Sequence, residues 1–288
     1  ISLMLHYAAA SGKPLFSMSD NPVFQPLKLF DREVLRDVRV VLADIDDTLT
    51  TDGKLTAEAY TAMEQLSQIG IHVAPVTGRP AGWCDHIARM WPVVGIVGEN
   101  GAFYYSYNDE TRRMMRVYAQ DDATRRANRQ RLERLATEIL AVVPGAAISA
   151  DQFARDTDLA IDFCEDVTPL PQSDIDRIVA VFEAAGATAK VSSIHVNGWF
   201  GDHDKLTMAR RFLNDVLSID VEKENTAVAY IGDSPNDAPM WRYFKNGIGV
   251  ANALAYKGHL AAEPKFVTTR ESGAGFVELA EALINAAK

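Results

Sequence analysis

The sequence contains only two cysteines, Cys84 and Cys164, and they lie far apart in the chain. This spacing argues against a disulfide framework or a zinc site built from clustered cysteines, and it fits the reducing cytoplasm. Long apolar runs are also missing, because no stretch approaches the roughly 18 residues of a membrane-spanning helix. We therefore expect a cytoplasmic protein that does not cross a membrane.

Basic residues are scarce relative to acidic ones: 29 Lys and Arg stand against 39 Asp and Glu, which gives a net charge of −10. Affinity for nucleic acid rests largely on a basic surface, so this charge argues against a nucleic-acid partner. An anionic small substrate would need local help, such as a bound cation. The length of 288 residues allows roughly two domains of ordinary size.

The first residues hold a short apolar patch without a basic region before it, which makes a poor secretory signal. Met18 is a candidate start of the protein, and residues 1–17 would then be upstream or added sequence. We expect residues 1–37 to form an N-terminal extension.

From Val38 onward, apolar strand-like segments alternate with segments of helical periodicity, a rhythm typical of α/β proteins. After about Tyr107 the pattern changes to alternating strands and long amphipathic helices, and the α/β rhythm later returns. We predict a doubly wound, Rossmann-like parallel-sheet core over residues 38–107 and 199–288, with an inserted α+β domain over residues 108–198.

Polar residues follow the predicted core strands or open a helix at four places. Asp44, Asp46 and Thr48 follow the first strand, Thr77, Gly78 and Arg79 follow the second, Lys205 opens a helix, and Asp233, Asn236 and Asp237 follow the strand TAVAYI. Ligands of open parallel sheets bind beyond the carboxyl ends of the strands, so we expect these groups to converge. Crowded carboxylates repel one another unless a divalent cation lies among them, and Mg²⁺ prefers oxygen ligands.

These residue types suit phosphoryl transfer. A carboxylate such as Asp44 can attack phosphorus and form an aspartyl-phosphate. Asp46, two residues later, could protonate the leaving oxygen and then activate water. Lys205 supplies a compact positive charge, while Thr77 and backbone N–H groups could hold phosphoryl oxygens as charge develops.

In this order, DIDDT, the apolar strand ending in Thr77, Lys205 and GDSPND resemble the four motifs of the haloacid dehalogenase (HAD) superfamily. The resemblance covers the chain from about Val38, although Leu206 stands where Cof-like members often have glycine after the lysine. The long stretch between Thr77 and Lys205 puts the insertion between the second and third motifs. With GENGA before it, this arrangement resembles the type II, subclass B group of Cof-like and sugar-phosphate phosphatases.

The resemblance implies roles for individual residues. Asp44 matches the nucleophile and Asp46 the general acid and base, while Thr77 and Lys205 complete the catalytic set. The implied Mg²⁺ ligands are Asp44, the carbonyl of Asp46, and Asp233, with Asp237 as a further acid near the metal. Candidate residues for binding the substrate or its phosphate are Thr48, Gly78, Arg79, Asn100 and Asn236.

The predicted function is a Mg²⁺-dependent phosphomonoesterase that acts on a small phosphorylated metabolite, first of all a sugar phosphate, with the insert as a lid. A phosphomutase of the phosphomannomutase type is the first alternative, because it shares core motifs and insert placement. A non-catalytic HAD-fold binding module is another, although all four motif residues Asp44, Asp46, Lys205 and Asp233 are present. A nucleic-acid phosphatase is disfavoured by the acidic charge.

Two further groups have a structural and a functional interpretation. Glu99, Asn100 and Gly101 form either a tight turn only or a substrate-side element. His195 and Asn197 lie on the last predicted strand of the insert, where a partly buried structural role is favoured over contact with substrate.

Overall fold

The computed structural model describes residues 23–192 and 194–288. The described residues divide into two compact units. Residues 23–72 and 224–288 form unit 1, and residues 73–192 and 194–223 form unit 2. The predicted start at Met18 lies outside the described residues, as does the N-terminal extension up to residue 22. Among the described residues, no helix has both the length and the apolar character needed to cross a membrane.

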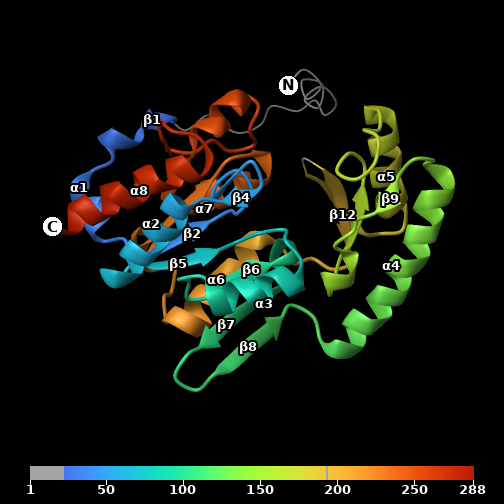
Figure 1. The fold of residues 1–288 in the computed structure, drawn as a ribbon, viewed down its shortest axis with the longest axis horizontal. Helices are drawn as coiled ribbons and strands as arrows, with labels where there is room; N and C mark the ends of the chain where they lie inside the picture. Colours follow the sequence, from blue (N-terminus) through green and yellow to red (C-terminus); the bar gives the residue numbers. More distant parts are fainter. Residues whose placement is uncertain (1–22, 193) are drawn as a thin grey trace. The chain divides into compact units, whose positions relative to one another are not determined.

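Unit 1 is built around a parallel sheet with neighbouring strands in the order β1, β15, β14, β13 and β2 (Figure 1). These strands are β1 (Gln25–Pro26), β2 (Val40–Ala43), β13 (Val228–Gly232), β14 (Asn246–Gly249) and β15 (Phe266–Val267). Every residue of β2, β13 and β14 is buried. Burial on both faces explains why the central strands read as continuous apolar runs rather than alternating patterns.

Helices and short elements complete unit 1. They are η1 (Leu27–Leu29), α1 (Arg32–Arg36), the hairpin β3 (Thr50–Thr51) and β4 (Lys54–Leu55), α2 (Ala57–Gln68), η4 (Asn225–Ala227), η5 (Pro235–Asp237), α7 (Ala238–Tyr243), η6 (Ala251–Tyr256) and α8 (Ser272–Ala287). The Thr56 hydroxyl caps α2 by accepting the Ala59 N–H at 3.2 Å. Both α1 and α2 pack against α8.

The register of the central strands brings two carboxyl ends together. β13 pairs with β2 so that Ile231 lies opposite Ala43. The Asp44 N–H donates to the Ile231 carbonyl at 3.0 Å, which extends the pairing by one residue. The residues that follow β2 and β13 therefore emerge side by side, as the parallel rule predicts.

Unit 2 holds two antiparallel sheets, with strand orders β6-β7-β8 and β11-β12-β10-β9. After β5 (His72–Pro75), which begins at the boundary, its elements are α3 (Ala81–Met90), β6 (Ile96–Gly98), η2 (Glu99–Gly101), β7 (Phe103–Asn108), β8 (Arg113–Tyr118), α4 (Asp122–Val142), β9 (Ala147–Ile148), η3 (Gln152–Ala154), β10 (Leu159–Asp162), α5 (Gln172–Ala184), β11 (Thr188–Val191), β12 (His195–Trp199) and α6 (Lys205–Leu217). The segment GIVGENGAFYY forms two strands, β6 and β7, which run antiparallel across η2.

The segment from α4 to β12 has its own apolar core. The buried side chains of this core all lie between Leu132 and Phe200, and they come from both helices and from the four-stranded sheet. The α/β prediction is confirmed by the parallel sheet of unit 1, and antiparallel sheets separate from it are present as well. The inserted domain over residues 108–198 stays a prediction; residue 108 ends β7, inside the β7–β8 hairpin.

Candidate active site

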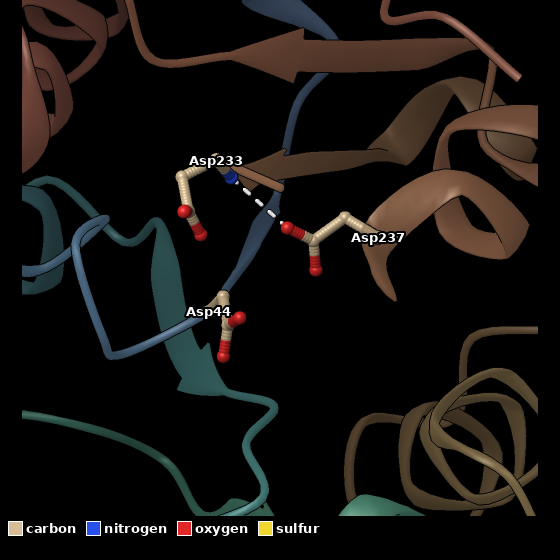
Figure 2. Close-up of side chains that lie close together, drawn as sticks. All are labelled: Asp44, Asp233 and Asp237. Carbon is tan, nitrogen blue, oxygen red and sulfur yellow. Dashed lines mark hydrogen bonds between the residues drawn. The ribbon is translucent and has the colours of Figure 1, made fainter. Parts of the chain in front are cut away.

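Three aspartates converge in unit 1 at the carboxyl ends of β2 and β13 (Figure 2). Asp44 follows β2, Asp233 follows β13, and Asp237 ends η5. One carboxylate oxygen from each lies within 4.8 Å of the others. Such an all-oxygen donor set fits a hard divalent cation such as Mg²⁺, which would also offset the mutual repulsion of the three carboxylates.

Asp237 is completely buried, and its two oxygens accept three hydrogen bonds. The Tyr230 hydroxyl donates to Oδ1, while the N–H groups of Asp233 and Ser234 donate to Oδ2 at 2.9 and 3.2 Å. Burial, together with the charges of Asp237 and Asp44, raises the pKa of Tyr230 well above its usual value, so this hydroxyl stays a donor. Asp237 therefore fixes the turn that carries Asp233.

A glycine is required beside this turn. A Cβ atom on Gly232 would lie 2.3 Å from Asp237 Oδ2, so any larger residue would displace the carboxylate. In the sequence GDSPND, Gly232 must therefore be glycine, and Asp237 holds the turn.

Asp44 is buried, and its Oδ1 accepts the Ile45 N–H at 2.9 Å. The Thr48 hydroxyl is also buried, and it donates to Asp233 Oδ1 at 3.3 Å. Asp46 is half-buried two residues after Asp44. Thr48 therefore orients Asp233, in addition to its predicted role in binding the substrate or its phosphate.

Asn236 is exposed, and its Oδ1 accepts a hydrogen bond from the Ser234 hydroxyl at 3.2 Å. The structure thus places this predicted substrate residue on the solvent side of the turn. Its contact with substrate stays a prediction.

The loop Thr77–Arg79, which carries the second motif, lies in unit 2, and β6 and η2 hold its backbone. The Thr77 N–H donates to the Val97 carbonyl at 2.9 Å, and the Thr77 carbonyl accepts the Asn100 N–H at 3.0 Å. The Arg79 N–H donates to the Thr77 hydroxyl oxygen at 3.0 Å. The Arg79 guanidinium lies over the Trp83 ring, 4.5 Å from its centroid.

Lys205 is the first residue of α6 and is 8% exposed, so it is not the solvated helix residue that its type alone would suggest. The Asp204 side chain caps the helix by accepting the Thr207 N–H at 2.7 Å. Gly101 has φ of +100°, and a Cβ there would lie 2.0 Å from the Asp204 carbonyl oxygen. Within unit 2, η2 therefore packs directly on the start of the helix that carries Lys205.

Glu99 is a buried acid whose environment the sequence did not reveal. Its Oε1 accepts the N–H groups of Ala81 and Asp156 at 2.9 and 2.8 Å. Its Oε2 accepts the Thr157 N–H at 2.7 Å and the Thr157 hydroxyl. Burial, reinforced by the charge of Asp158, raises the pKa of Glu99 to about 7. The glycine before Glu99 and the Asn100-Gly101 pair after it indicate an exposed turn. The sequence does not reveal the burial of Glu99, because its hydrogen-bond partners at 156 and 157 lie far along the chain.

This raised pKa predicts a pH-dependent contribution of Glu99 to stability. An unfolded Glu99 ionises near pH 4.5, whereas the folded one keeps its proton up to about pH 7. The stabilisation is therefore complete below pH 4.5 and is lost as pH rises to 7, by roughly 3 kcal/mol. We expect urea unfolding to show the wild type losing stability relative to Glu99→Gln across this window.

The matched control for this pH series is Glu138→Gln, because Glu138 is exposed on α4. Its difference from the wild type should stay constant with pH. A constant difference for Glu99→Gln as well would contradict the raised pKa.

His195 and Asn197, which lie in the predicted insert, are both buried. His195 Nε2 lies 2.9 Å from Glu165 Oε2, and the Asn197 amide donates to Asp158 Oδ2 at 3.1 Å. Both observations agree with the favoured structural interpretation.

Comparisons with known proteins point to one superfamily. Residues 41–128 match the sequence model of a family described as haloacid dehalogenase-like hydrolase. A structure from Plasmodium vivax, described as a HAD/COF-like hydrolase, shares 19% identity with a TM-score of 0.63, covering 88% of this chain and 99% of that one. No curated protein sequence matches the chain.

Two further similar structures are phosphatases by their descriptions. The C-terminal domain of C. albicans trehalose-6-phosphate phosphatase has a TM-score of 0.68 at 12% identity, covering 93% of this chain and 99% of that one. Sucrose-phosphatase from Synechocystis, solved with sucrose and phosphate, has a TM-score of 0.59 at 14% identity, covering 86% and 98%. At these identities the likeness concerns the fold. Residues 41–128 are therefore similar in sequence to the haloacid dehalogenase-like hydrolases, and the described part of the chain shares the fold of these structures.

Proposed function

We propose that this protein is a Mg²⁺-dependent phosphatase that hydrolyses a small phosphomonoester through an aspartyl-phosphate intermediate. The observation that carries the proposal is the position of Asp44, which follows a central strand with its carboxylate within 4.8 Å of those of Asp233 and Asp237. A sugar phosphate is the first substrate class to test, because two proteins of similar fold are described as phosphatases of sugar phosphates.

The proposed metal ligands are Asp44, the Asp46 carbonyl and Asp233. Asp237, whose oxygens already accept three hydrogen bonds, would act on the metal site mainly by holding Asp233 in place. When bound, Mg²⁺ would neutralise charge on the enzyme and polarise the phosphoryl group.

In the proposed reaction an Asp44 oxygen attacks phosphorus, and the bond between phosphorus and the leaving oxygen breaks. Asp46 gives its proton to that oxygen, then takes one from the water that hydrolyses the aspartyl-phosphate. Thr77, the Gly78 N–H and Lys205 would bind phosphoryl oxygens, as the motifs imply.

The remaining predicted residues belong to this proposal as contacts of the substrate. Arg79, Asn100 and Asn236 would lie on the substrate side, and the inserted domain would exclude water and select the leaving group. We also place the protein in a reducing compartment such as the cytoplasm, because its sequence holds only two cysteines, which lie far apart.

The test is phosphate release from a panel of sugar and nucleotide monophosphates, with Mg²⁺ or with a chelator. We expect Mg²⁺-dependent release that favours sugar phosphates. Isomerisation of a sugar phosphate without release would indicate a mutase, and no reaction with any compound would contradict the proposed function.

A further inference from the structure

Hydrogen bonds from a buried cluster fix the backbone of the loop Thr77–Arg79, and the proposed mechanism does not use this cluster. Its three consecutive carbonyls each accept a hydrogen bond. Thr77 accepts from the Asn100 N–H at 3.0 Å, Gly78 from Arg155 Nη1 at 3.3 Å, and Arg79 from the Glu99 N–H at 3.2 Å. Side chain and backbone donors thus fix the orientation of each peptide plane in turn.

Fixing these carbonyls also fixes the donors of the loop. In a planar trans peptide the C=O and the following N–H point in opposite directions. The bond from Asn100 to the Thr77 carbonyl therefore turns the Gly78 N–H away from η2. The Thr77 hydroxyl accepts the Arg79 N–H, which leaves its own hydrogen to donate to a ligand.

Arg155 is 3% exposed and is itself held by two carboxylates. Its Nε and Nη2 donate to Asp151 at 3.0 and 3.1 Å, and its Nη1 donates to both oxygens of Asp158 at 3.1 and 3.0 Å. The planar guanidinium has five donors in a fixed geometry, so bonds to both aspartates aim Nη1 at the loop. Arg155 lies between η3 and β10, far along the sequence from the loop that it contacts.

Glu99 makes further hydrogen bonds to the residues around this loop. Each of its oxygens accepts two donors, from Ala81 at the start of α3 and from Asp156 and Thr157 beside Arg155. Its φ of 41° is left-handed, as is that of Asn100 at 55°. Two consecutive non-glycine residues in this region persist only where their surroundings hold them, and such strain concentrates at functional sites.

We propose that Glu99 and Arg155 are positioning residues that set the phosphate-binding geometry of the Thr77–Arg79 loop. This inference rests on the proposed function, in which the loop binds the phosphoryl group. It makes residues 155–157 of the predicted insert necessary for every substrate, because the loop meets the phosphoryl group that all of them share. The other insert residues would affect only the choice of leaving group.

The test uses Glu99→Gln and Arg155→Lys, with Glu138→Gln as the control on the exposed face of α4. The glutamine keeps the shape of Glu99 but turns an NH₂ group towards N–H donors, while the lysine keeps the charge without the planar donor set. At about pH 8, where Glu99 is ionised, inorganic phosphate binding would be measured by ³¹P NMR, and kcat and KM with an aryl phosphate and with the best sugar phosphate.

We expect phosphate to bind about 10-fold more weakly to both variants. We expect kcat/KM to fall by about 10- to 100-fold, and by the same factor for the aryl phosphate and the sugar phosphate. The control should stay within about twofold of the wild type. Folded variants that bind phosphate as the wild type does would overturn the proposal. A loss confined to the sugar phosphate would overturn it too, because that result assigns the cluster to the leaving group.

The failure of this proposal can be distinguished from the failure of the proposed function. A wild type that binds phosphate but hydrolyses nothing would contradict the phosphatase, while weaker phosphate binding by the variants would still support the positioning role. Failure of both variants to fold, judged by circular dichroism and thermal unfolding, would assign the cluster to stability alone and overturn the proposal.

Discussion

Asp44→Asn is expected to lower turnover by at least about 10⁴-fold, because an amide oxygen is a poor nucleophile towards phosphorus. The substitution is nearly isosteric, and the amide oxygen can still accept the Ile45 N–H that the carboxylate accepts at 2.9 Å. The fold should therefore survive while the chemistry fails. Steady-state kinetics on the best substrate measure the loss, and intact mass after acid quenching detects the phosphorylated enzyme.

The matched control is Asp47→Asn, which removes the same charge from the same loop. Asp47 is exposed and has φ of 53°, a left-handed conformation that asparagine tolerates well. We expect its activity to stay within about threefold of the wild type, since exposed charges are screened. Retained turnover in Asp44→Asn would refute the nucleophile assignment, and an equal loss in both variants would show that only local charge matters.

The convergence of Asp44, Asp233 and Asp237 could be predicted because it follows from two simple rules. Buried parallel strands appear as apolar runs, and parallel strands end at the same edge of a sheet. The pairing of β2 with β13 then brings Asp44 and Asp233 together, although they lie far apart in the sequence. Both rules depend on regular backbone geometry, so one sequence suffices to apply them.

The details that could not be predicted depend on irregular backbone and on distant partners. The hydrogen bonds of Asp237 are one such detail, because the turn directs two N–H groups and the Tyr230 hydroxyl onto its oxygens. Glu99 accepts hydrogen bonds from residues 156 and 157, whose position depends on how distant parts of unit 2 pack. No local pattern reports such contacts. Asn100-Gly101 indicates a turn, but the sequence does not show that this turn reverses the chain into β7.

Asp233→Asn is expected to raise the Mg²⁺ concentration needed for half-maximal activity by at least about 100-fold. Loss of a residue that only orients a metal ligand lowers metal affinity by about 10- to 100-fold, so loss of a proposed ligand should cost at least as much. The asparagine keeps the backbone N–H that donates to Asp237, and its oxygen can still accept from Thr48. The change therefore removes charge from the proposed metal site without disturbing the turn. The increase in unfolding temperature that Mg²⁺ causes is a second readout, and it does not depend on turnover.

Comparison of Asp233→Asn with Asp44→Asn separates metal binding from nucleophilic attack, although both acids belong to one cluster. Saturating Mg²⁺ should restore much of the activity of Asp233→Asn, because its nucleophile is intact, but none of the activity of Asp44→Asn. Asp52→Asn, at an exposed position of unit 1, should leave the Mg²⁺ requirement unchanged. Activity that resists a chelator, or an unaltered Mg²⁺ requirement in Asp233→Asn, would contradict a metal site at these carboxylates. Rescue of both variants by Mg²⁺ would instead make Asp44 a ligand only, and the attacking group would then have to be water.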